Sequence, residues 1–129
     1  MNQPVLPSDI APPAARYAHG VRSPAGAELL HTAGVVPIAP DGSVPAAIGE
    51  QAAVVWANID AILHDGGFEA RDLVSVTTYV VPDQDLAAVM AARSAYLGDH
   101  LVASTLVVVA ALVRPEWKVE IAVVAARTP

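Results

Sequence analysis

Two apolar runs in the C-terminal third of the chain limit its folds more than any other feature. Residues 106–109 and 119–124 are apolar at almost every position, which is the pattern of strands covered on both faces. The β-rich segments that contain them, 105–113 and 117–126, are predicted as two strands joined by a short turn at 114–116. What covers the two faces of such a sheet therefore decides the fold.

Two predicted helices supply part of that cover. In the first, apolar residues recur at steps of three and four from Ile48 to Leu63 and the pattern ends at Gly66. Gln51 and Asn58 flank this stripe two turns apart, where we expect their amides to bond backbone groups of the sheet. A second helix is predicted to start after a cap and to run to about residue 97. Its capping residue is Asp83 or Asp85, and its apolar stripe is Leu86, Val89, Met90 and Leu97.

The remaining segments complete an α+β chain. Residues 73–81 are rich in Val, Thr and Tyr and predict a strand, 17–22 and 28–36 predict an opening hairpin, and a further short strand is expected near Val44. Four prolines make residues 1–15 an extended, weakly ordered lead-in to a single domain over 16–129.

We therefore expect a sheet of about five to six strands with two helices on one face. Because two helices cover only one face, the other face needs a different cover. A closed homo-oligomer in which the sheets of several copies face inward supplies it without further sequence.

Charge and composition exclude several classes of function. The 129 residues carry 13 acidic and 7 basic side chains, a net charge of −6, and no cysteine. Nucleic acid is not an expected partner, because a phosphate backbone is repelled and no basic cluster offsets this. Neither a signal peptide nor an apolar stretch long enough for a membrane is found, so we expect a cytoplasmic protein. The four histidines show no metal-binding spacing, and we expect no metal and no cofactor.

Glu120 is the first candidate for chemistry, because it interrupts the apolar run 119–124. A buried, unpaired carboxylate costs several kcal/mol. Burial also favours its neutral form, which suits a general acid or base at neutral pH. The alternative is that Glu120 points to solvent at an edge or pairs with an arginine across a subunit contact.

Six short segments occur in order between residues 16 and 126. They are Arg16-Tyr17-Ala18-His19; Thr32-Ala33-Gly34 leading to Pro37 and Asp41-Gly42; Glu50-Gln51 with Asn58-Ile59, Leu63 and Gly67; Asp72 to Tyr79; Ala103-Ser104-Thr105; and Val119-Glu120-Ile121. Together they resemble the Rid (reactive intermediate deaminase, YjgF-type) family. The resemblance implies a chorismate-mutase-like α+β fold assembled as a homotrimer, with three clefts between neighbouring subunits.

Active members of that family hydrolyse enamines and imines such as 2-aminoacrylate to a keto acid and ammonia, without metal or cofactor. Carried over by position, the resemblance implies that Tyr17 lines the cleft and that Glu120 holds or activates the water. It also implies that the backbone of Ala33, Gly34 and Val35 offers N–H groups. Ser104 and Thr105 would lie on the cleft wall.

The chain departs from the family pattern at one position that matters for substrate binding. Deaminating members carry an arginine that clamps the substrate carboxylate, and Ala103 stands in its place. A methyl group cannot replace a bidentate guanidinium contact. Arg93, on the second helix, and Arg114, in the last turn, are the candidates for a substitute. The alternative for Arg93 is a solvated arginine or one in an intersubunit salt bridge.

Two functions follow from these observations. The first is a homotrimeric enamine or imine deaminase that acts through Glu120 at an intersubunit cleft, with 2-aminoacrylate disfavoured by Ala103. The second is a non-catalytic trimer that binds a small molecule or a partner segment. If neither arginine reaches the cleft, the pocket is neutral to acidic and favours uncharged or cationic ligands. The older family label of ribonuclease is disfavoured by the net charge.

Overall fold

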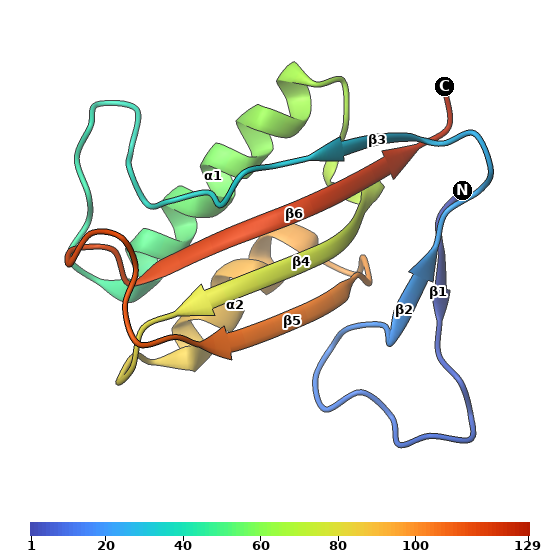
Figure 1. Ribbon diagram of the computed structural model, residues 1–129, viewed down its shortest axis with the longest axis horizontal. Coiled ribbons are helices and arrows are strands. Elements are labelled where there is room, and N and C mark those ends of the chain that lie inside the picture. The colour runs from blue at the N-terminus through green and yellow to red at the C-terminus, as the bar shows by residue number, and fades with distance from the viewer.

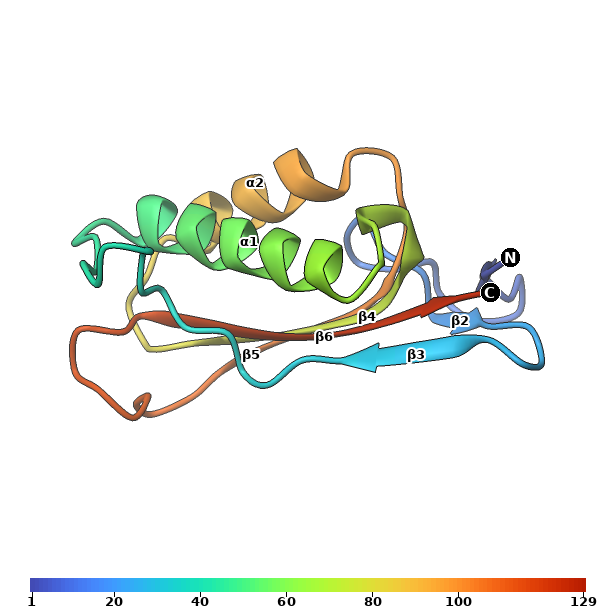
Figure 2. The same ribbon diagram turned by 90° about the horizontal axis from the view of Figure 1, so that it is seen from above.

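The computed structural model describes residues 1–129 and has two layers, a sheet and a pair of helices that lie on one of its faces (Figures 1 and 2). The short 3₁₀ helix Ala70–Asp72 leads into the first central strand. The other elements in chain order are β1 (Gln3–Val5), β2 (Gly20–Arg22), β3 (Glu28–His31), α1 (Ile48–Asp65), β4 (Leu73–Val80), α2 (Leu86–Leu97), β5 (Ala103–Val108) and β6 (Val119–Arg127).

The main sheet has four strands in the order β3-β6-β4-β5. The pairs β3–β6 and β6–β4 are antiparallel, whereas β4 and β5 are parallel. They are parallel because α2 carries the chain back along the layer of helices between them, as a crossover helix does. The expected α+β class is confirmed, with two helices on one face. The six strands divide into this sheet and a two-stranded sheet of β1 and β2, so a single sheet of five or six strands is not formed.

Both predicted hairpins are wrong. The segment near residue 20 pairs with β1 from the lead-in, whereas β3 pairs with β6, since Leu30 packs against the core beneath the helices. The last two strands do not pair with each other either, because β4 lies between them. The strand expected near Val44 does not form, and residues 109–118 are a long connection between β5 and β6.

The expected lead-in 1–15 is held to the domain at its start. Gln3–Val5 pairs with Gly20–Arg22, with Pro4 opposite Val21 in an edge position where a missing N–H is tolerated. The Asn2 side-chain amide also donates to Ala126 O at 2.8 Å.

Helix α1 forms where its periodicity predicts, and its buried side fills the core. Val55, Ile59 and Leu63 are fully buried against the inner face of the sheet, while Ile62, expected in the same stripe, is partly exposed. At its end, Gly66 caps the helix and Gly67 adopts a positive φ of 82°, which favours glycine.

Helix α2 begins at the predicted cap, where the Asp85 side chain accepts a hydrogen bond from Ala87 N at 3.0 Å. Val89 and Leu97 of the predicted stripe are buried, but Leu86 is exposed. The third buried position on this helix belongs to a charged residue, Arg93, which sequence periodicity had not placed inside.

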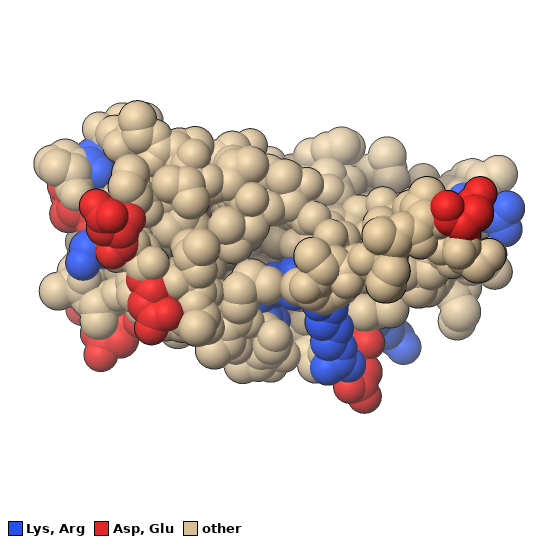
Figure 3. All heavy atoms as spheres, turned by 90° about the horizontal axis from the view of Figure 1, so that it is seen from below, with Lys and Arg blue, Asp and Glu red and all other residues tan.

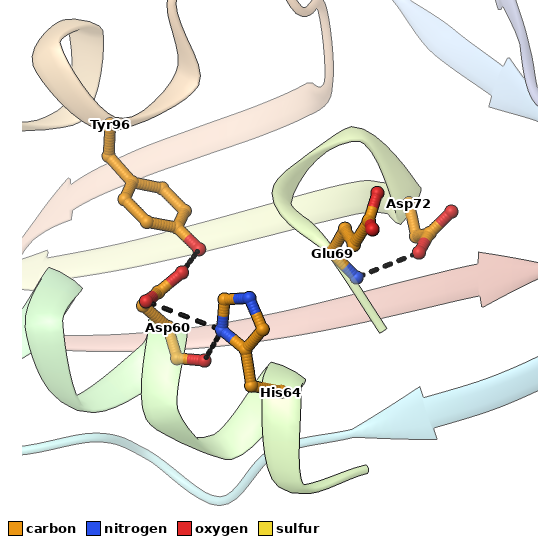
Figure 4. Close-up of polar contacts among 5 residues, drawn as sticks. All are labelled: Asp60, His64, Glu69, Asp72 and Tyr96. Atoms are coloured by element: carbon orange, nitrogen blue, oxygen red, sulfur yellow. Dashed lines mark hydrogen bonds and ion pairs between the residues drawn. The ribbon is translucent and has the colours of Figure 1, made fainter. Parts of the chain in front are cut away.

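The two helices are joined by a polar and aromatic contact on their outer side (Figure 4). The Tyr96 hydroxyl donates to Asp60 Oδ1 at 2.7 Å, and the Tyr96 ring stacks on Trp56 with centroids 5.0 Å apart. Burial, followed by the bond to Asp60, raises the pKa of Tyr96 above its usual range. His64 lies beside the same carboxylate, with Nδ1 3.4 Å from Asp60 Oδ2.

The sheet face away from the helices is uncovered within the chain (Figure 2). Strand alternation turns one set of side chains to this face, which we call the open face. It is formed by Leu29 and His31 of β3; Ser75, Thr77 and Tyr79 of β4; Ala103, Thr105 and Val107 of β5; and Glu120, Ala122 and Val124 of β6. Neither helix combines the length and apolar character that crossing a membrane requires.

Candidate functional site

Glu120 lies in a hollow of about 520 Å³ on the open face. The hollow is bounded on one side by the connection after β5, through Val109, Ala111, Leu112 and Val113. Its other lining residues are Gly34, Tyr79, Glu120 and Ala122. Of these eight residues only Glu120 carries a charge, so the hollow is an apolar site with one carboxylate.

Gly34 gives the Glu120 carboxylate its place. A Cβ atom added to Gly34 would lie 2.8 Å from Glu120 Cδ and still closer to Oε2. The carboxylate therefore packs directly on the glycine backbone, where any larger residue would displace it. This contact brings together two residues that are 86 positions apart.

A β-bulge beside β6 leaves backbone donors next to this carboxylate. His31 pairs with Val124 and Val35 pairs with Ile121, so three residues of one segment face two of the other. Thr32 fills the irregularity, since its hydroxyl accepts from Val123 N at 3.0 Å.

The Ala33 and Gly34 N–H groups donate to no group of the chain. The Val35 N–H, which we expected to be available as well, donates to Ile121 O at 2.7 Å. Two of the three expected donors are therefore available, and the third holds the segment to β6.

Two amides of α1 hold both sides of the site. Asn58 donates to Ile38 O at 2.9 Å and so holds the segment that contains Gly34. Gln51, fully buried, donates to Glu116 O at 2.8 Å and accepts from Lys118 N at 2.9 Å, just before Glu120. Both amides therefore have a structural role as expected, but their partners lie in the connections beside the sheet and not in its strands.

The other predicted site residues form a second group at the start of β5. Ala18 pairs with Ala103, and Ala18 N donates to Val102 O at 2.9 Å, which places Tyr17 beside this strand. The Tyr17 ring meets the His19 ring edge-on, with centroids 6.4 Å apart. Ala103 and Thr105 are on the open face, and Ser104 between them turns to the helix side.

Arg93 contacts this second group from behind, on the helix side of β5. Its guanidinium donates to Ser104 Oγ at 2.7 Å and to Arg16 O at 3.0 Å, and only 4% of the residue is exposed. Nε has no partner, and desolvation lowers the pKa of the guanidinium below its usual range. The alternative of a solvated arginine is therefore wrong. These contacts tie α2 to the backbone just before Tyr17.

The residues around Glu120 and the group at the start of β5 are too far apart to form one site within a chain. Glu120 pairs with Tyr79, which pairs with Val107, four residues along β5 from Ala103. With ordinary strand dimensions this places Ala103 about 13 Å along the strands and about 10 Å across them from Glu120. If the two groups act together, one of them must come from another subunit.

Sequence reasoning missed Tyr79 and the apolar connection 109–113. Tyr79 carries a usable signal, because the alternation of 73–81 together with a pairing to β6 places it beside Glu120. The connection carries none, since its apolar residues are indistinguishable from a strand in the sequence.

The fold is an α+β sheet with two helices on one face and an open face that carries a single carboxylate, Glu120. The family model described as endoribonuclease L-PSP matches residues 8–127. The chain belongs to this family, which includes the Rid and YjgF proteins.

Solved structures agree with this assignment over nearly the whole chain. A Rid family protein of unknown function, YyfB from Yersinia pestis, is 28% identical with a TM-score of 0.86 and coverage of 98% of both chains. The YjgF protein of Escherichia coli is 29% identical with a TM-score of 0.72, covering 97% of this chain and 98% of its own. TdcF of Escherichia coli, solved with bound serine, is 26% identical with a TM-score of 0.73, and the match covers 95% of this chain and 94% of TdcF.

A curated relative, the 2-iminobutanoate/2-iminopropanoate deaminase of Escherichia coli K12, is 33% identical over 73 residues. The match covers 56% of this chain and 57% of the relative, so it spans little more than half of either protein.

Proposed function

We propose that the protein is a homotrimeric hydrolase of imines or enamines whose cleft lies between subunits and uses Glu120. The observation that carries the proposal is the lone Glu120 carboxylate, packed on Gly34 beside two backbone N–H groups without acceptors. The name of the curated deaminase relative supports the same reaction class.

The reaction needs few groups, and those on the open face suit it. A water held by Glu120 adds through its oxygen to the imine carbon, and its proton passes to the carboxylate. The resulting carbinolamine then loses its nitrogen as ammonia and leaves a carbonyl, so that R₂C=NH and H₂O give R₂C=O and NH₃. The Ala33 and Gly34 N–H groups provide fixed donors for a substrate or intermediate oxygen beside that position.

A trimer supplies what a single chain lacks. The β5 edge of the open face carries Tyr17, Ala103 and Thr105 far from Glu120 of the same chain. A head-to-tail ring of three subunits places one chain's β5 edge against the next chain's Glu120. Tyr17 and Thr105 would then line the wall opposite the carboxylate. Arg93 acts in this arrangement as a positioning residue, through Ser104 and the backbone of Arg16.

The test is ammonia release from imines generated in situ by an oxidase or a dehydratase, with wild type beside Glu120→Gln. The glutamine keeps the size and the hydrogen bonding of the side chain but cannot take a proton. We expect wild type to exceed the buffer rate and the variant to lose about 10²- to 10⁴-fold. Equal rates for the two proteins would refute the proposed role of Glu120.

A non-catalytic binding trimer is the second candidate, and it is favoured by Ala103, which stands where the resemblance implies a carboxylate-binding arginine. In that case small ligands bind at the cleft, but no imine is hydrolysed faster than in buffer.

A further inference from the structure

We propose that the cleft selects imines that carry no carboxylate, namely neutral or protonated imines with a short apolar chain. This inference rests on the proposed function and specifies its substrate class.

All seven cationic side chains are engaged away from the hollow around Glu120. Two pair with carboxylates, Arg16 with Asp99 at 2.6 Å and Arg71 with Glu69 at 2.7 Å. The others bond neutral groups or stack on a ring: Arg22 on Gln3, Arg93 on Ser104, Lys118 on Ala46 O, Arg127 on Gly67 O and Arg114 over Trp117. None of the seven lines the hollow.

The wall that a neighbouring subunit would add carries no unpaired cation, because Arg16, next to Tyr17, is paired with Asp99. The open face of β5 presents Ala103, Thr105 and Val107, which are all uncharged. Seen from the side of β5 and α2, charged groups gather at the two ends of the molecule and in one cluster between them, and the remaining surface is uncharged (Figure 3).

Arg93 contacts the strand that forms that wall, through Ser104, but it is held on the other side of the strand. Two of its nitrogens already donate hydrogen bonds, and 4% exposure leaves no room for a ligand carboxylate to reach it. To clamp a substrate, the side chain would have to leave Ser104 and the Arg16 carbonyl and pass to the opposite face of β5.

Apart from the Ala33 and Gly34 N–H groups, which can bond a neutral oxygen, the surroundings of Glu120 favour a cation or a neutral group. A substrate carboxylate would lie close to a second negative charge in an apolar hollow, where repulsion between like charges is poorly screened. A protonated imine instead gains a charge-assisted contact with Glu120. The apolar side chains of 109–113 suit a short hydrocarbon chain, and Val113 is 87% exposed in the single chain.

A matched pair of substrates tests the preference directly. A flavin amine oxidase converts butylamine to butanimine, and an amino-acid oxidase converts norvaline to 2-iminopentanoate. Hydrolysis gives butanal or 2-oxopentanoate, with one ammonia released in each case. The two imines differ only in the carboxylate. We expect kcat/KM for butanimine to exceed that for 2-iminopentanoate by about tenfold or more.

Variants distinguish the cause of the preference. Ala103→Arg should raise kcat/KM for 2-iminopentanoate by about tenfold or more, because it provides the missing clamp. It should not raise kcat/KM for butanimine, which has no carboxylate. Arg114→Ala should change neither rate by more than about twofold, since that guanidinium stacks on Trp117. A wild-type preference for 2-iminopentanoate, or one that depends on Arg114, would overturn the inference while the proposed function stands.

Stable probes separate this result from a failure of the proposed function. Butylammonium, butyramide and butyrate can be titrated into the labelled trimer while the amide shifts of residues 109–113 are followed. We expect the first two to bind at least about tenfold more tightly than butyrate. If neither imine is hydrolysed faster than in buffer, the enzymatic proposal fails, and these titrations then decide the ligand class alone. Tighter binding of butyrate than of butylammonium and butyramide would refute the proposed preference for ligands without a carboxylate.

Discussion

At the scale of single residues, the chemistry depends on where the Glu120 carboxylate lies, and Gly34 determines that position. The sequence pattern indicated Glu120 because it interrupts an apolar run, but it predicted equally well a carboxylate enclosed by the core. The structure places Glu120 on the uncovered side of β6, half-buried in the single chain. Which face a residue takes follows from strand register, and local pattern alone does not determine register.

Replacing Gly34 with alanine tests this contact. The added Cβ would overlap the Glu120 carboxylate, which is the far end of a flexible side chain, so the carboxylate should move and the fold should survive. We expect Gly34→Ala to lower kcat by about tenfold or more with less than about 1 kcal/mol of lost stability. Gly20→Ala is the matched control, because its Cβ would meet nothing closer than 3.8 Å. Unchanged turnover in the Gly34 variant would show that the carboxylate position does not matter.

At the scale of elements, the sequence predicted the helices and the central strand β4 well and the strand pairing poorly. Helix α1 ends at Gly66 and α2 starts after Asp85 because periodicity and caps are local signals. Pairing is not local. The last two strands are adjacent in sequence, but the α2 crossover places β5 parallel to β4, and β6 takes the other side of β4. The bulge that frees the Ala33 N–H group also has no sequence signature.

The contact between the helices predicts that the folded protein loses stability at alkaline pH. Because the pKa of Tyr96 is raised in the folded protein, the folded state keeps this proton above pH 10 while the unfolded state loses it. The stability that Tyr96 contributes is therefore complete below about pH 10 and falls as the pH rises further, by at most about 1.4 kcal/mol per pH unit.

Urea unfolding of wild type and Tyr96→Phe at several pH values measures this effect. At pH 8 wild type should be more stable by about 1 kcal/mol, since the hydroxyl bonds Asp60. The difference should shrink between pH 10 and 11. Two stability curves that stay parallel over this range would contradict the role assigned to Tyr96.

At the scale of the whole molecule, the open face of the sheet is the surface that no element of the chain covers. The uncovered second face expected from the sequence indicated an oligomer, and the open face is the surface that we propose such an assembly buries. Leu29 and Val107 on the open face are 58% and 39% exposed in the single chain. Large exposed apolar side chains on one face are typical of an interaction surface.

A charge on this face should prevent assembly. We expect Val107→Asp to convert the proposed trimer to monomers in sedimentation velocity, because a buried unpaired carboxylate at an interface costs several kcal/mol. Ala53→Asp, on the exposed side of α1, is the matched control and should remain a trimer. A trimeric Val107→Asp protein would mean that the subunits meet through another surface.

The composite cleft between subunits is the central claim, and mixed trimers test it most directly. Glu120→Gln removes the carboxylate from one side of the cleft, and Ala103→Trp blocks the other, so each variant alone should be inactive. Co-assembled at equal amounts, they should recover about a quarter of wild-type imine hydrolysis. That is the share of clefts that combine Glu120 from one variant with Ala103 from the other. A mixture no more active than the two variants assembled separately would contradict the claim.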